Sequence, residues 1–352
     1  MELASAPISV GDVPVEPELD SCRSCKSAQS IAPVDLMRKL IARILGSDVV
    51  SENPPVCIDI GASGALPSEW RLLAPHSICV AFDADTREFR IDDSSSGGWR
   101  RLVKLNRLVA EKSTDAVDFF LTKSPFCSSS LHPDSAALER WAFSGLFEVE
   151  RKVSLPAVSL TRTLADLGIQ HIDWYKSDTQ GIDLRVFASL PSGMINHVIV
   201  ADFEPGIIDA YEGEDKLFAV MHFMNSRPFF VSDMKIWGSQ RIDAAGLRSL
   251  NTVQRRFVSS ILKMSPGWSE LTYLNDFSGA PDSRRQYYLG WVFSTIKKQD
   301  GHALAIAERG LRIFADPVFE DCRRASLRQM RARYPQLALH VLRRGLAKVF
   351  GR

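Results

Sequence analysis

The sequence predicts an α/β protein in which helices flank a mostly parallel central sheet and a helical appendage follows it. Short, near-continuous apolar runs, such as residues 55–62 and 78–85, alternate with helical stretches. Such runs are typical of parallel strands that are buried on both faces by helical crossovers. The chain has 352 residues, more than one core commonly holds, and its pattern becomes mainly helical after residue 239. We therefore expect a Rossmann-like domain over residues 31–238 and a mainly helical extension over residues 239–352.

The charge balance and the lack of long apolar segments restrict the partners and the compartment that we expect for this protein. The chain has 43 basic and 42 acidic residues and a net charge of +1, so no whole-protein field attracts nucleic acid, and no nucleic-acid partner is expected. Its first residues show no basic segment followed by an apolar run, and no window holds the roughly 20 apolar residues of a membrane span. We expect a cytoplasmic protein.

The cysteines are too few and too scattered to predict a disulfide framework. Cys22 and Cys25 form a Cys-x-x-Cys pair, but a zinc site requires further ligands and no second pair follows. Both fall in residues 1–30, which are rich in Pro, Ser and acidic side chains and are expected to form a mobile leader. We expect reduced thiols.

The elements are predicted in order along the chain. Residues 33–45 predict a helix with one apolar face, made of Leu36, Leu40, Ile41 and Ile44. Strands are predicted within residues 55–62, 78–85, 101–110, 172–178 and 195–204. Residues 115–158 break this rhythm and predict an insertion of strands and loops near the ligand edge. Helices follow at residues 245–264, 302–316 and from Val318 onward, with residues 287–293 as a candidate last strand of the sheet.

The first strand runs into a turn of small residues: Gly61, Ala62, Ser63 and Gly64. Such a turn lets the backbone approach a ligand closely and exposes N–H groups at a helix start. The spacing is neither the Gly-x-Gly-x-x-Gly of dinucleotide enzymes nor a phosphate loop, which needs a Lys-Ser/Thr pair. The turn, together with Asp59 on the strand, predicts a site for a nucleotide-type cofactor.

Two carboxylates end the second predicted strand. Asp83 and Asp85 follow about twenty residues after the glycine turn. An ionised acid at this place accepts hydrogen bonds from the hydroxyls of a ribose and repels the 2′-phosphate of NADP. Both residues are therefore candidates for cofactor binding, whereas the plainer interpretation is a solvated strand end.

The third cluster, residues 173–183, is an aromatic strand that ends Lys176-x-Asp178-x-Gln180-Gly181-x-Asp183. This pattern resembles the central signature of FkbM-type methyltransferases, whose usual form is Lys-x-Asp-x-Glu/Gln-Gly-x-Glu. Further landmarks of that family have counterparts in the expected order between about Pro55 and Asp233: Asp59–Ala62, Ala81–Asp83, Ser128–Leu131, Thr163–Leu167, and Glu204 with Tyr211–Gly213.

The sequence departs from that family at three places. The glycine turn is one residue tighter, and the acids at positions 83 and 183 are Asp rather than Glu. The resemblance implies a class I methyltransferase sandwich that uses S-adenosylmethionine. It also implies O-methylation of a hydroxyl on a sugar, glycan, lipid or other secondary-metabolite acceptor.

The resemblance also suggests roles for single residues. Transfer of a methyl group to an alcohol oxygen requires in-line placement and removal of a proton. Asp178 is expected to act as base or as ligand to a divalent cation, with Glu204 as the next carboxylate on the same edge. Lys176 lies one strand period from Asp178 and is expected to hold its carboxylate in an ion pair. His132 and His222 are alternative bases, although a lone histidine more often lies on the surface or in the core.

Two alternative functions stay open. An NAD-linked oxidoreductase shares the βαβ plan but requires a third glycine that is missing here. A binding or scaffold module would keep the fold without the chemistry.

Residues 318–352 are locally basic, and an apolar stripe in 337–350 permits peripheral membrane contact, binding in a partner's groove or, most commonly, packing on the core.

Overall fold

The structure is a computed structural model that describes residues 33–64, 66–87, 98–278 and 283–334. The predicted leader with Cys22 and Cys25 and the apolar stripe of 337–350 lie outside these residues, so the structure bears on neither prediction. The other four cysteines are buried free thiols, as expected.

A seven-stranded sheet forms the centre, with the order β3-β2-β1-β7-β8-β10-β9. Its strands are β1 (Val56–Ile60), β2 (Ile78–Phe82), β3 (Arg101–Leu105), β7 (Trp174–Ser177), β8 (Val200–Phe203), β9 (Phe229–Gln240) and β10 (Met264–Asn275). Strand β10 runs antiparallel to both of its neighbours, β8 and β9, and the remaining pairs in the sheet are parallel. From β1 the chain continues to β2 and β3 on one side of the sheet, and the later strands start with β7 on the other side of β1. Ligands commonly bind at such a switch point, outside the carboxyl ends of the strands.

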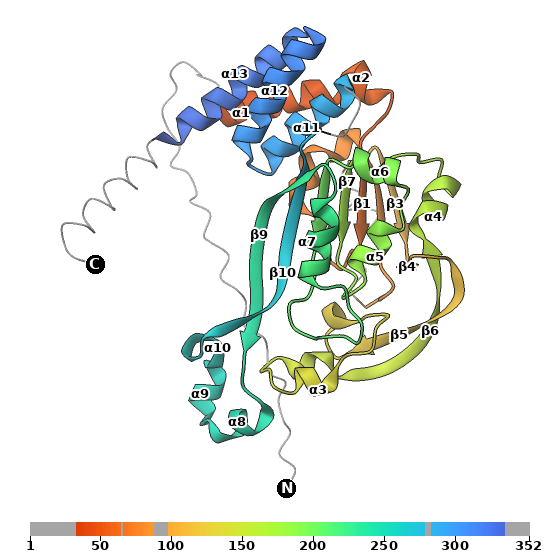
Figure 1. Cartoon of the computed structure of the whole chain (residues 1–352), viewed down its shortest axis with the longest axis vertical. Helices are drawn as coiled ribbons and strands as arrows, with labels where there is room; N and C mark the ends of the chain where they lie inside the picture. The colour runs from red at the N-terminus through yellow and green to blue at the C-terminus, as the bar shows by residue number, and fades with distance from the viewer. Residues whose placement is uncertain (1–32, 65, 88–97, 279–282, 335–352) are drawn as a thin grey trace, which may run out of the picture. The chain divides into compact units, whose positions relative to one another are not determined.

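Helices cover both faces of this sheet (Figure 1). The α-helices are α1 (Pro33–Leu45), α2 (Asp48–Ser51), α3 (Ser135–Leu138), α4 (Leu160–Asp166), α5 (Asp183–Ala188), α6 (Ser192–His197), α7 (Leu217–Asn225), α8 (Ala244–Ser249), α9 (Thr252–Arg256), α10 (Val258–Ile261), α11 (Arg284–Ile296), α12 (Asp300–Phe314) and α13 (Pro317–Ala332). The helix predicted over 33–45 is confirmed, and it buries Leu40, Ile41 and Ile44 while Leu36 is exposed. Within the described residues, every helix is too short or too polar to cross a bilayer.

The strand side chains alternate between two apolar cores. On β1, Cys57 belongs to the core shared with α1, α2 and α11–α13, whereas Ile58 belongs to the core shared with α4–α7. Trp174 and Tyr175 divide in the same way on β7. Because successive residues of a strand point to opposite faces, this division produces three layers, helix, sheet and helix.

The segment predicted as one strand over 101–110 is divided. Its first half is β3, and its second half is β4 (Leu108–Ala110), which belongs to a separate three-stranded sheet with the order β4-β6-β5. The other strands of that sheet are β5 (Thr114–Thr122) and β6 (Val149–Ser159). The predicted insertion of strands and loops is thereby confirmed. The small core of the three-stranded sheet consists of Leu108, Phe119, Leu121 and Ala157.

Two predictions for the C-terminal part are corrected. The boundary at 238/239 falls inside β9, and β10, a strand of the seven-stranded sheet, lies in the region expected to be mainly helical. Residues 287–293 lie in α11, not in a strand, and every one of them is buried between the sheet and the last two helices. An apolar run that is buried all round has no helical or strand periodicity, so the sequence pattern could not distinguish the two.

Candidate functional site

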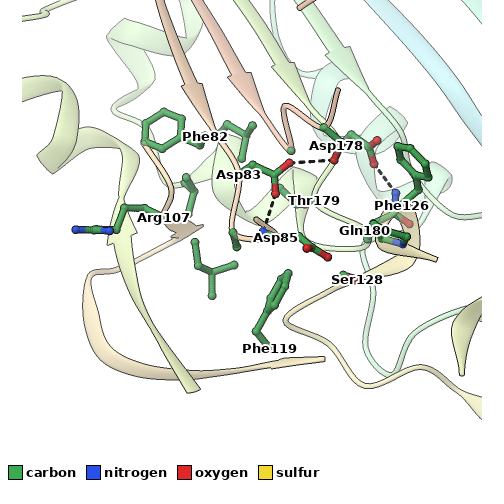
Figure 2. Close-up of a pocket in the computed structure, with 17 residues that line it drawn as sticks. Phe82, Asp83, Asp85, Arg107, Phe119, Phe126, Ser128, Asp178, Thr179 and Gln180 are labelled. Atoms are coloured by element: carbon green, nitrogen blue, oxygen red, sulfur yellow. Dashed lines mark hydrogen bonds between the residues drawn. The ribbon is translucent and has the colours of Figure 1, made fainter. Parts of the chain in front are cut away.

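A pocket lies at the carboxyl ends of β1, β2 and β7, next to the switch point of the sheet (Figure 2). It holds about 520 Å³ of space, part of it open to solvent. Its lining residues are Ile60, Gly61, Ser63, Phe82, Asp83, Ala84, Asp85, Arg107, Leu108, Val109, Phe119, Pro125, Phe126, Ser128, Asp178, Thr179 and Gln180. The three predicted clusters, from strands far apart in sequence, therefore meet at one place.

The glycine turn borders the pocket through Gly61 and Ser63, whereas Ala62 is buried and neither it nor Gly64 lines the pocket. The amide N–H groups of Gly61 and Ala62 both donate to the carbonyl oxygen of Phe82, each at 2.9 Å. These two donors are therefore engaged by β2 and do not face a ligand, which corrects the expectation of exposed N–H groups. The next described helix is a 3-10 helix at Ser68–Leu72, so no α-helix starts at the turn.

Asp83 lies directly beside this turn, as predicted. Its Oδ2 accepts a hydrogen bond from the Ser63 hydroxyl at 2.9 Å, and its Oδ1 accepts one from the amide of Asp85 at 2.8 Å. The side-chain amide of Asn106 donates to the Asp83 carbonyl oxygen and holds the strand end in place. Burial raises the pKa of Asp83, and the two hydrogen bonds to its carboxylate oppose that shift. Figure 2 shows this carboxylate facing the pocket.

Asp85 also lines the pocket, but its carboxylate already forms an ion pair within the protein. Arg87 donates to both oxygens of Asp85, with Nη2 at 2.7 Å from Oδ2, and also to the hydroxyl of Ser128 at 2.9 Å. Burial alone would raise the pKa of Asp85, but the hydrogen bonds from Arg87 outweigh it and lower the pKa. Asp85 is therefore a positioning residue that joins the end of β2 to the insertion, and Arg87 is the partner that sequence reasoning missed.

Asp178 follows β7 and borders the pocket, with Glu204 nearby at the end of β8 but outside the lining residues. Burial raises the pKa of Asp178, and the negative charge of Asp178 is the main cause of the raised pKa of Glu204. Because the charge of one carboxylate opposes ionisation of the other, the pair tends to retain one proton. Such a pair is suited to accept a second proton from a substrate.

Lys176 does not pair directly with Asp178, which corrects the prediction. Its Nζ donates to Oδ1 of Asp59 at 2.8 Å. Asp59 and Lys176 are register partners on adjacent strands, so their side chains share one face, whereas Asp178 lies beyond the last strand residue. Burial alone would lower the pKa of Lys176, but the charges of Asp59, Asp178 and Glu204 outweigh burial and raise this pKa, so Lys176 stays cationic. Asp59 is therefore a buried ion-pair partner and not a pocket residue.

A hydrogen-bond relay orients Asp178. Gln180, at φ 55°, donates from Nε2 to Oδ1 of Asp178 at 2.5 Å. The hydroxyl of Tyr211 lies 3.0 Å from Gln180 Oε1 and 2.9 Å from the carbonyl oxygen of Cys127. The Ser129 hydroxyl donates a hydrogen bond to the backbone carbonyl oxygen of Gln180 at 2.7 Å. The serine-rich segment and the tyrosine are sequence landmarks, but their contact with Gln180 follows only from the fold.

The last acid of the signature has a structural role. Asp183 is fully buried, and one of its oxygens accepts hydrogen bonds from the Ser177 hydroxyl and from the amide and hydroxyl of Thr179. These bonds hold the loop that carries Asp178. An acid one carbon shorter than Glu is sufficient here because its partners belong to the same loop.

The two alternative bases do not reach the pocket lining. His132 contacts Glu212 at 3.4 Å and packs edge-on against Phe120. His222 is an exposed residue of α7. Among the described residues, no group of three or more His, Cys, Asp or Glu side chains could hold a metal ion. A divalent cation would find two carboxylates here, Asp178 and Glu204, and would need water or substrate for its other ligands.

Comparison of the chain with protein-family models, with curated proteins and with solved structures gave no significant match. The fold alone does not fix the function, because folds of this class carry many chemistries. Function therefore has to be inferred from the chemistry of the site.

Proposed function

We propose that this protein is an S-adenosylmethionine-dependent methyltransferase that transfers a methyl group to a hydroxyl of an acceptor. The observation that carries the proposal is the meeting of Gly61, Asp83 and Asp178 around one pocket at the switch point. The order of these three motifs along the chain is that of the FkbM-type methyltransferases that the sequence resembles.

The residues fit the nucleoside part of this cofactor. Each carboxylate oxygen of Asp83 accepts one intramolecular hydrogen bond and retains a lone pair for a ribose hydroxyl. Leu108, Val109 and Phe119 provide apolar surface in the same pocket, which suits a purine ring. Asp83 would therefore bind the ribose, while Asp85 remains paired with Arg87.

The sheet also favours this cofactor over a dinucleotide. A dinucleotide-binding sheet has six parallel strands in the order 3-2-1-4-5-6. Here the antiparallel strand β10 lies between β8 and β9. An antiparallel strand at this place agrees with the class I methyltransferase sandwich implied by the resemblance. The absence of the Gly-x-Gly-x-x-Gly spacing in the sequence points the same way.

The Asp178–Glu204 pair provides the base. When bound, S-adenosylmethionine supplies an electrophilic methyl group on its sulfonium. Asp178 would accept the proton of the acceptor hydroxyl as that oxygen attacks the methyl group, while Glu204 keeps the proton that the pair already retains. Lys176, held by Asp59, keeps a positive charge near both carboxylates. The same pair could instead place a divalent cation that acidifies the hydroxyl, with two protein oxygens and the remainder from water and acceptor.

Calorimetric titration tests the cofactor. We expect the purified chain to bind S-adenosylmethionine and not NAD. In Asp83→Asn the affinity should fall about 10- to 100-fold, because a charged acceptor of ribose hydroxyls is lost. Asp115→Asn, an exposed change on β5, is the matched control and should bind as the unmodified chain does. Binding of NAD, or equal affinity in Asp83→Asn, would overturn the proposal.

Turnover distinguishes an enzyme from a binding module of the same fold. Cell extract incubated with the protein and with cofactor carrying a deuterated methyl group should yield a labelled product by mass spectrometry. The product identifies the acceptor class among sugars, glycans, lipids and other hydroxylated metabolites. Cofactor binding without any labelled product would favour the non-catalytic module.

A further inference from the structure

Strands β9 and β10 form an arm that extends beyond the central sheet (Figure 1). The two strands pair along nearly their whole length, but only Leu271–Leu274 of β10 pair with β8. Residues 244–263, here called the arm tip, join the two strands and contain helices α8, α9 and α10. None of these three helices buries a single residue. The arm tip therefore adds nothing to the core of the protein.

The arm tip presents an apolar stripe to solvent. Val253, Phe257 and Ile261 are 66%, 50% and 52% exposed. The amide of Phe257 bonds to the carbonyl of Val253, and the amide of Ile261 bonds to that of Phe257, so the three side chains follow each other on one helical face. Exposed apolar groups that line up in this way usually mark an interaction surface.

The arm tip is also strongly basic. It contains four basic residues, Arg248, Arg255, Arg256 and Lys263, and no acidic residue, although the whole chain has a net charge of only +1. Within the part of the chain that the structure describes, none of the four forms an ion pair with an acidic side chain. Arg255 donates to the carbonyl oxygen of Leu250, but no described carboxylate neutralises any of the four charges, which can therefore meet an anionic partner.

We propose that the arm tip docks on the surface of an anionic lipid bilayer. Helical segments with cations beside an apolar face bind at the boundary between headgroups and acyl chains, where the apolar face is buried and the cations meet lipid phosphates. Nucleic acid also offers phosphates, but of the three stripe residues only Phe257 has a ring on which a base could stack. The inference rests on the arm tip alone and does not depend on the proposed methyl transfer.

Flotation of the full chain with lipid vesicles tests the inference. The unmodified chain should float with vesicles of phosphatidylcholine and phosphatidylserine and remain unbound with phosphatidylcholine alone. Arg255→Gln with Arg256→Gln should weaken partitioning about 30-fold, at roughly 1 kcal/mol per cation. Val253→Ser, Phe257→Ser and Ile261→Ser together should weaken it about 100-fold, because three apolar contacts are lost.

Matched controls separate the arm tip from other surfaces. Phe218→Ser removes a 74% exposed apolar side chain from α7, and Arg312→Gln removes an exposed cation from α12. Both should float as the unmodified chain does, as should a chain lacking residues 336–352. Unchanged melting temperatures exclude unfolding of the arm-tip variants. No flotation of the unmodified chain, undiminished flotation of the arm-tip variants, loss on deletion of 336–352, or a gel shift with RNA in place of vesicle binding would each overturn the inference.

Discussion

The backbone of Asp178 passes so close to Gly61 that no side chain fits between them. A Cβ on Gly61 would lie 2.0 Å from the Asp178 carbonyl oxygen. The approach follows from a hydrogen bond at 2.9 Å, in which the amide of Asp178 donates to the carbonyl of Ile60. The glycine turn and the loop after β7 are thereby held in direct backbone contact.

Gly61→Ala should therefore destabilise the protein by about 2–5 kcal/mol, combining a left-handed φ of 79° with overlap against backbone. Urea unfolding measures this loss. Gly64→Ala is the matched control, because its φ is 75° and no atom lies within 4 Å of the added carbon. It should cost only about 1–2 kcal/mol. Equal losses in the two variants would show that contact with Asp178 is unimportant.

Asp178→Asn should lower turnover about 10²- to 10⁴-fold and leave cofactor affinity within severalfold, because a base is removed without loss of volume. In the unmodified protein kcat/KM should rise with pH above the ordinary carboxyl pKa of about 4, since burial raises the pKa of Asp178 and a base must be deprotonated. Steady-state rates over a pH series and calorimetry measure both effects.

The pair itself can be observed by NMR of labelled carboxyl groups. Because the charge of Asp178 is the main cause of the raised pKa of Glu204, Asp178→Asn should lower that pKa toward its ordinary value. Asp115→Asn should leave it unchanged. An unaltered Glu204 titration in Asp178→Asn, or retained turnover, would remove the pair from the mechanism.

Tyr211→Phe tests the relay to Asp178. The ring remains packed 5.6 Å from Phe147, but the hydroxyl that contacts Gln180 is lost. The Gln180 amide is then free to rotate, and we expect about a tenfold fall in kcat, with KM for the cofactor unchanged. The pH profile of kcat/KM should also shift, which a purely structural change would not cause. Tyr273→Phe, a buried change on β10, should alter neither quantity.

Asp173→Asn tests the buried ion pair at the amino end of β7. Arg285 on α11 donates to both oxygens of Asp173 at 2.8 Å, and the amide of Val56 donates to one of them. We expect a loss of about 3–5 kcal/mol near neutral pH, because the substitution leaves the Arg285 charge without its partner. Asp166→Asn, which breaks an exposed pair with Arg162, should cost less than about 1 kcal/mol.

The pH dependence of that loss has a definite sign. Burial alone would raise the pKa of Asp173, but Arg285 and His171 outweigh it and lower the pKa well below its usual range. A lowered carboxyl pKa adds stability above the unfolded value of about 4, and this stability is lost as the pH falls through the folded pKa. Unfolding free energies of the two proteins should therefore converge in acid. A gap that widens in acid would contradict this assignment.

Sequence patterns were sufficient for the elements whose periodicity is unambiguous. Helix α1 agrees residue for residue with its prediction, and the strands before Gly61, Asp83 and Asp178 lie within their predicted segments. The pattern failed at α11, because an element buried on all sides carries no amphipathic signal. It also failed at β3 and β4, where one apolar run feeds two different sheets.

The sequence by itself determined which acids, glycines and strands could build a site, because residue type and spacing restrict local backbone conformation and chemistry. Only the tertiary structure decided their partners. In the fold, Lys176 pairs with Asp59, Arg87 pairs with Asp85, and Gln180 donates a hydrogen bond to Asp178. These pairings depend on strand register and on segments distant in the chain, and neither is encoded in any local window of residues.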